Sequence, residues 1–256
     1  MIEVLSPNEI NKGKVSGRLV GSILQTLKER TQVGTNLLEI DKWVKSMVEE
    51  AGAISCYVDY APSFGDGPFG HYICTSVNDA VLHGKPYNYR LKNGDLLTLD
   101  LALIKDGIAA DAAISFIVGD KKATEDLRMI ETTEKALAAG IAAAKLGATI
   151  GDISHAVGKV LSKAGYPINL EFGGHGIGST MHQDPHISND GKARRGYKLR
   201  PGMMLAIEPW IMADTNRLIT DADGWTLKSA TGGRTAHTEH TIAITDSGTE
   251  ILTLPE

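Results

Sequence analysis

The chain has 256 residues and a net charge of −5, with 26 Lys and Arg side chains against 31 Asp and Glu. The acidic balance argues against sequence-specific nucleic acid or an anionic membrane as the main partner, because either favours a basic face. Cys56 and Cys74 are too few for a disulfide scaffold, and no apolar run approaches the roughly 18 residues of a membrane span. We therefore expect a cytoplasmic protein with no membrane partner.

Helix signals dominate the start of the chain. Ser6 and Glu9 match a capping box around Pro7, and apolar residues at i+4 spacing predict a helix over 7–30. A second helix is expected over 37–51, where Gly52 ends it. Strands are expected over 56–60 and 72–77, on either side of a glycine-rich loop over 63–71.

Two alternating apolar segments between 96 and 117 surround Asp106-Gly107, which is a strong hairpin signal. With a two-residue loop, Asp100 faces Ala113, and Asp111 points to the same side of the sheet. A three-residue loop would shift the register and send the two carboxylates to opposite faces. If the two carboxylates share one face, they either form a half-buried charge cluster that needs a cation or are two strand-end aspartates in water.

The second half of the chain repeats features of the first. Helices are expected over 125–145 and 152–164, and strands over 203–211 and 237–244. The interval from Gly34 to Gly52 equals that from Gly147 to Gly165, with matching apolar positions between them. Chance is one explanation, and gene duplication is the one we favour. We expect one α+β domain over 1–256, with halves of about 1–120 and 121–256 and a site where they meet.

Five side chains with metal-binding chemistry occur in apolar strands or among glycines: Asp100, Asp111, His175, Glu208 and Glu239. Acids in such places are costly unless they are paired or coordinated. Four carboxylates with one imidazole suit a pair of divalent ions such as manganese, iron or cobalt, and fit a thiolate zinc site poorly. Two ions that share carboxylates could activate water and polarise a carbonyl together.

Five segments resemble the signature blocks of type I methionine aminopeptidases, in order and at that family's spacing: VNDAVLHGKP, LTLDLALIKDGIAADAAISFIVG, GGHGIGSTMHQDP, RPGMMLAIEPW and DGWTLKSATGGRTAHTEHTIAITDSGTEILT. The resemblance covers about residues 6–254. It implies the pita-bread fold, with two pseudo-symmetric halves of helices packed on antiparallel strands. It also implies two divalent metal ions, for which zinc and nickel are options besides cobalt, manganese and iron. The implied activity is hydrolytic removal of the initiator methionine from nascent proteins, by attack of a metal-bridging hydroxide on the first peptide bond.

The resemblance also implies a role for each predicted ligand. Asp100 is similar to the family's ligand of one metal, and His175 and Glu208 are similar to ligands of the other. Asp111 and Glu239 are similar to the ligands that bridge the two metals. His175, which lies between glycines, could otherwise be a loop histidine satisfied by backbone groups.

Three residues resemble the family's catalytic groups. His83 is similar to the histidine that hydrogen-bonds the substrate at the scissile amide, and His182 to the one that stabilises the carbonyl oxygen. Glu208 is similar to the residue that carries a proton to the leaving amine. His83 could instead be a turn histidine, and His186 competes with His182 in the same loop.

Cys74 and Trp225 match pocket-wall positions of the family, and we expect Phe69 and Met181 in the same substrate pocket, although Cys74, Trp225 and Met181 could be ordinary core residues. Loop 63–71 lacks the tyrosines that are usual in the family, so the preferred first residue stays open. His237 stands where the family more often has an amide, and is either a partner of the ligands or an extra ligand.

Two other functions compete with removal of methionine. A paralogue of the same fold could trim other N-terminal residues, as the altered loop suggests. A non-catalytic binding module would be expected to have lost ligands, and none is lost here. We expect a monomer whose partners are N-terminal methionyl peptides, while docking on ribosomes stays open.

Overall fold

The computed structural model describes residues 2–63 and 65–255, so Phe64 of the predicted loop lies outside the described residues. The helices are α1 (Pro7–Arg30), α2 (Leu37–Glu50), α3 (Thr124–Ala143) and α4 (Ile150–Ala164). The strands of the first half are β1 (Ile54–Ser55), β2 (Cys74–Val77), β3 (Ala80–Leu82), β4 (Leu96–Lys105) and β5 (Ile108–Ile117). Those of the second half are β6 (Gly174–Gly176), β7 (Gln183–Ile187), β8 (Met204–Ile207), β9 (Trp210–Met212), β10 (Leu218–Thr220), β11 (Leu227–Ser229), β12 (Thr235–His237), β13 (Glu239–Thr245) and β14 (Gly248–Ile251).

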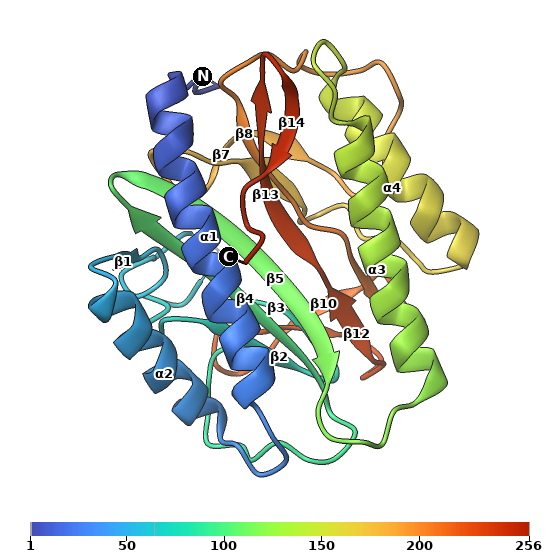
Figure 1. The fold of residues 1–256 in the computed structure, drawn as a ribbon. Coiled ribbons are helices and arrows are strands. Elements are labelled where there is room, and N and C mark those ends of the chain that lie inside the picture. The colour runs from blue at the N-terminus through green and yellow to red at the C-terminus, as the bar shows by residue number, and fades with distance from the viewer. Residues whose placement is uncertain (1, 64, 256) are drawn as a thin grey trace.

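One antiparallel sheet runs through both halves of the chain, in the order β1-β4-β5-β13-β8-β6-β7, with β2 paired to β4 and β14 to β13. Strands β5 and β13 join the halves, because Glu239 pairs with Ala113 and His240 with Ala112. Figure 1 shows α1 lying across β4 and β5, and α3 and α4 beside β13 and β12. The expected division into two duplicated halves stays a prediction.

Each helix pair covers its own part of the sheet. Leucines of β4, such as Leu99 and Leu101, are buried in a cluster with apolar residues of α1 and α2. Ile207 of β8 and Ile242 of β13 belong to a second cluster with α3 and α4. Side chains alternate across a strand, so the acids between these apolar residues point to the opposite face of the sheet. Among the described residues, no helix is both long enough and apolar enough to cross a membrane.

The sequence predicted the helices within two residues at each end. The Ser6 hydroxyl accepts from the Glu9 amide at 3.3 Å, and the Glu9 carboxylate accepts from the Ser6 amide at 2.7 Å, which confirms the capping box and α1. The same motif begins α2 and α4, although it was not predicted there. Helix α4 therefore begins at Ile150, two residues earlier than expected.

The predicted hairpin is confirmed, including its register. Lys105 pairs with Ile108 across the two-residue loop, and Asp100 pairs with Ala113. Asp106 and Gly107 have φ angles of 54° and 86°, as the primed turns that suit a twisted hairpin require. Asp100 and Asp111 consequently face the same side of the sheet.

The strand expected over 56–60 is wrong, because this segment turns. The Tyr60 amide donates to the Tyr57 carbonyl at 3.0 Å, which closes a turn directly after β1. Strand β2 also begins later than expected, at Cys74. The Tyr72 amide donates to the Asp41 carboxylate of α2 at 2.7 Å instead of pairing with a strand.

The strands expected over 203–211 and 237–244 are each divided into two shorter strands. Pro209 lacks the N–H that a ladder needs, so β8 ends before Glu208 and β9 begins after Pro209. The Thr238 amide donates to the Pro209 carbonyl at 3.2 Å, which separates β12 from β13. Both interruptions lie beside predicted ligands, Glu208 and Glu239.

Candidate active site

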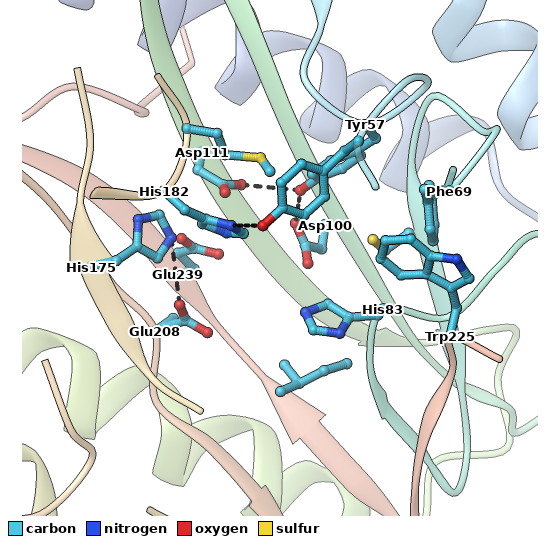
Figure 2. A pocket seen from close by; sticks show the side chains of 14 residues that line it. Tyr57, Phe69, His83, Asp100, Asp111, His175, His182, Glu208, Trp225 and Glu239 are labelled. Carbon is cyan, nitrogen blue, oxygen red and sulfur yellow. Dashed lines mark hydrogen bonds and ion pairs between the residues drawn. The ribbon is translucent and has the colours of Figure 1, made fainter. Parts of the chain in front are cut away.

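A cavity lies on the face of the sheet opposite the helices. All the residues predicted for the site line it, and they come from both halves of the chain: Phe69, Cys74, His83, Asp100, Asp111, His175, Met181, His182, Glu208, Trp225 and Glu239. Tyr57, Tyr60 and Leu82 complete the lining. Figure 2 shows the acids and His175 gathered on one side, and His83, Phe69 and Trp225 on the other.

The predicted ligands form two overlapping sets. Asp100, Asp111 and Glu239 each place a carboxylate oxygen within 4.8 Å of the others. His175, Glu208 and Glu239 do the same with a ring nitrogen and two carboxylate oxygens. Glu239 belongs to both sets, so one carboxylate joins the two groups.

The acids of this cluster have no Lys or Arg beside them among the described residues that line the cavity. Burial raises the pKa of Asp100 to about 6, and burial with the charge of Asp100 raises the pKa of Glu208 to about 8. Burial and the neighbouring acids also raise the pKa of Asp111 and Glu239 well above its usual range. The folded chain therefore concentrates negative charge where only a cation or protons can offset it.

His175 is arranged to offer a lone pair to this cluster. Burial lowers its pKa to about 3, so the ring is neutral at pH 7. Its Nδ1 lies 3.0 Å from the Gly176 carbonyl, which can only accept, so Nδ1 carries the hydrogen. Nε2 is then unprotonated, and lies 3.7 Å from Oε1 of Glu208. A backbone carbonyl that fixes the tautomer in this way is typical of metal-binding histidines.

Two further observations fit a metal centre. Oε1 of Glu239 is buried and has no hydrogen-bond partner among the described residues. An isolated buried oxygen of this kind is costly unless something coordinates it. The donor set is four carboxylates and one imidazole, which suits manganese, iron or cobalt.

His237 lies behind the predicted ligands and is almost fully buried. Its Nε2 is 3.7 Å from Oε2 of Glu239 and 3.9 Å from Oε2 of Glu208. Burial lowers its pKa to about 3, so the ring is neutral. These separations exceed hydrogen-bond distance, and His237 does not line the cavity. His237 therefore lies beside the two glutamates without a hydrogen bond to either, and both roles expected for it stay predictions.

Known proteins match this chain over nearly its full length. Residues 12–246 match the family model described as "Metallopeptidase family M24". The chain belongs to this family. It is 36% identical to methionine aminopeptidase of Aquifex aeolicus, covering 98% of each chain, and 36% identical to methionine aminopeptidase 1 of Bacillus subtilis, covering 99% of each.

Solved structures of known proteins have the same fold. A methionine aminopeptidase from Rickettsia prowazekii superimposes with a TM-score of 0.94 at 32% identity, over 99% of this chain and 100% of that one. A prolidase from Pyrococcus furiosus has a TM-score of 0.77 at 20% identity, over 99% of this chain and 66% of that one, which shows a shared fold alone. The predicted α+β pita-bread fold and the resemblance to methionine aminopeptidases are confirmed.

Two tyrosines of this M24 chain were missed by the sequence analysis. Tyr57 donates to Oδ1 of Asp100 at 2.5 Å and to Oδ1 of Asp111 at 3.3 Å. The Tyr60 hydroxyl lies 2.7 Å from Nδ1 of His182. In the expected strand, residues 57 and 60 would point to opposite faces. Because the segment turns instead, both rings line the cavity.

Aromatic and sulfur-containing side chains form the other wall of the M24 cavity. Phe69 packs edge-on against Trp225 and Tyr57, with ring centroids 5.1 and 5.7 Å apart. Cys74 and Met181 are buried in the same apolar cluster. A Cβ atom at Gly65 would lie 2.5 Å from Cζ2 of Trp225, so the backbone at Gly65 packs directly on this wall.

His83 approaches the cavity from the end of β3. Its φ angle of 54° is unusual for a residue other than glycine, and such strain is often found at functional sites. Its ring packs edge-on against Phe172 and Trp225, at 5.6 and 6.4 Å. Burial lowers its pKa to about 4, so a neutral imidazole lies between the acids and the aromatic wall.

Proposed function

We propose that this chain is a metal-dependent aminopeptidase that removes the initiator methionine from nascent proteins. The observation that carries the proposal is the convergence of Asp100, Asp111, His175, Glu208 and Glu239 on one cavity. Similarity to methionine aminopeptidases over nearly the full length of both chains supports this reaction over other hydrolytic reactions.

The five side chains would hold a pair of divalent ions. Asp100, Asp111 and Glu239 offer oxygens to one position, and His175, Glu208 and Glu239 offer donors to a second. Manganese, iron and cobalt suit this donor set best, and zinc and nickel are further options. When bound, the ions supply an activated water and polarise the carbonyl of the first peptide bond.

Three side chains would act on the peptide itself. His182 lies at the cavity mouth next to His175, with ring centroids 4.4 Å apart, and can donate to the carbonyl oxygen as charge develops on it. His83 can hydrogen-bond the scissile amide from the other side of the cavity. Glu208, which belongs to the second ligand set, can carry a proton to the leaving amine, as the family resemblance implies.

The methionine side chain of the substrate would pack against the wall formed by Phe69, Cys74, Met181 and Trp225. These residues are buried, and only small parts of them face the cavity. Sulfur and aromatic groups make favourable contacts with a thioether. The proposed partners are therefore methionyl N-termini, and we propose that the enzyme acts as a cytoplasmic monomer.

Release of methionine from a Met-Ala-Ser peptide tests this function. The purified protein should release methionine after loading with Mn²⁺, lose the activity with a chelator, and regain it when Mn²⁺ is restored. Leu-Ala-Ser and Pro-Ala-Ser peptides distinguish the paralogue with another first-residue preference. Metal-loaded protein that binds Mn²⁺ and leaves Met-Ala-Ser intact would contradict the proposal.

A further inference from the structure

A hydrogen bond links the two halves of the chain at the mouth of the cavity. Tyr60 belongs to the turn after β1, and His182 directly precedes β7. The Tyr60 hydroxyl lies 2.7 Å from Nδ1 of His182, and the ring centroids are 5.3 Å apart at 70°. Figure 2 draws a dashed line for this bond from the ring of His182.

The chemistry of the two groups assigns the hydrogen in this bond. Among the described residues, the Tyr60 hydroxyl has one hydrogen-bond partner, Nδ1 of His182, and either atom could carry the hydrogen between them. A phenol is a good donor, and an unprotonated imidazole nitrogen is a good acceptor. An imidazole with the ordinary pKa of about 6.5 is neutral at pH 8, so it carries one ring hydrogen. With Nδ1 accepting from Tyr60, that hydrogen belongs on Nε2.

The tautomer matters because His182 is close enough to act as a ligand. One of its ring nitrogens lies within 4.8 Å of donor atoms of both Asp111 and His175. A metal ligand needs an unprotonated nitrogen, whereas stabilising a carbonyl oxygen needs an N–H. His175 has the reverse arrangement, because the Gly176 carbonyl holds the hydrogen on Nδ1.

We propose that Tyr60 is a positioning residue that holds His182 as the Nε2–H tautomer, which keeps this ring a hydrogen-bond donor to the substrate and out of the metal coordination. The proposal rests on the proposed aminopeptidase function for its catalytic part alone. In this arrangement His182 donates a hydrogen bond through Nε2, whereas His175 offers an unprotonated Nε2 as a metal ligand. The difference arises because Nδ1 of His182 faces Tyr60 and Nδ1 of His175 faces the Gly176 carbonyl.

Nitrogen NMR of the histidine rings tests the tautomer without any need for activity. In ¹⁵N-histidine-labelled protein at pH 8, free of metal or loaded with diamagnetic Zn²⁺, the His182 signals are identified by their loss in His182→Asn. We expect a protonated Nε2 and an unprotonated Nδ1 in the wild type. A protonated Nδ1 on His182 would overturn the proposal, even if every Tyr60 variant fails to fold.

Kinetics test the consequence for catalysis. Tyr60→Phe should lower kcat for Met-Ala-Ser by about 10- to 100-fold with KM little changed, because the binding wall stays in place and the donor loses its orientation. Its His182 signals should show a mixture of tautomers. Tyr197→Phe, at a tyrosine that is 61% exposed, is the matched control and should behave as wild type. Tyr60→Phe with the kcat and the NMR signals of the control would overturn the positioning role.

The two arms separate failure of this proposal from failure of the proposed function. A protein that never releases methionine still reports the His182 tautomer by NMR. An active enzyme with the Nδ1–H tautomer rejects the role of Tyr60 and leaves the aminopeptidase activity intact.

Discussion

The Tyr57 hydroxyl donates a 2.5 Å hydrogen bond to Oδ1 of Asp100 and also lies 3.3 Å from Oδ1 of Asp111 (Figure 2). One phenol therefore connects the turn after β1 to both strands of the hairpin. Burial and the charges of the two aspartates raise the pKa of Tyr57 well above its usual range, so it stays a donor. The hydrogen bond in turn favours the ionised form of Asp100, which opposes the effect of burial.

Tyr57→Phe should weaken metal binding. Without the phenol, Asp100 and Asp111 lose a donor that favours the charged form and holds their orientation, so affinity for Mn²⁺ should fall by about 10- to 100-fold. Titration calorimetry at pH 7.5 measures the change. Tyr89→Phe is a suitable control, because it removes a 2.9 Å hydrogen bond to Asp95. Equal affinities in the two variants would contradict the role of Tyr57.

The metal-free protein should lose stability as the pH rises from 6.5 to 8. Carboxyls whose pKa is raised on folding stabilise the fold fully below their unfolded pKa, and this contribution is lost as pH rises through the folded pKa. For Glu208 that window extends from 4.5 to about 8. His83 and His175, whose pKa is lowered, act in the opposite direction, but only below pH 6.5.

Thermal unfolding at a series of pH values checks this behaviour. Chelator-treated protein should show a falling Tm between pH 6.5 and 8, whereas Mn²⁺-loaded protein should not, since bound cations offset the acid charges. A metal-free protein whose Tm is constant or rises across this interval would show that the acids are not crowded as described.

Gly107→Ala should destabilise the hairpin while leaving the cavity intact. Gly107 has a φ of 86°, and a Cβ there would meet nothing within 4 Å, so the cost is conformational. We expect a loss of about 1–2 kcal/mol in the free energy of unfolding by urea, with metal affinity unchanged. Gly107→Asn should cost less, because asparagine adopts this conformation more readily. Equal losses for alanine and asparagine would argue against conformational strain at this position.

The sequence predicted the parts of the molecule that depend on local patterns. Asp106-Gly107 fixed the register, and the register placed Asp100 and Asp111 on one face. Ser6 and Glu9 defined the start of α1 correctly. In each case the signal is a short motif whose backbone conformation is settled by the residues themselves.

Other features depend on contacts that no local pattern specifies. Tyr57 and Tyr60 read as strand residues, but the turn that brings both into the cavity is stabilised by acids and a histidine from distant segments. The interruption at Pro209 had a visible signal in the missing amide hydrogen, whereas its bond to Thr238 could not be foreseen. The duplicated halves and the roles of the individual ligands stay predictions.

The position of bound metal tests the central claim most directly. Crystals grown with Mn²⁺ and measured at a wavelength where manganese scatters anomalously should show a pair of peaks, one against Asp100, Asp111 and Glu239 and one against His175, Glu208 and Glu239. Both peaks should disappear when Asp111 and Glu239 are replaced by alanine. Manganese bound elsewhere, or no peak in contact with these side chains at saturating Mn²⁺, would contradict the account.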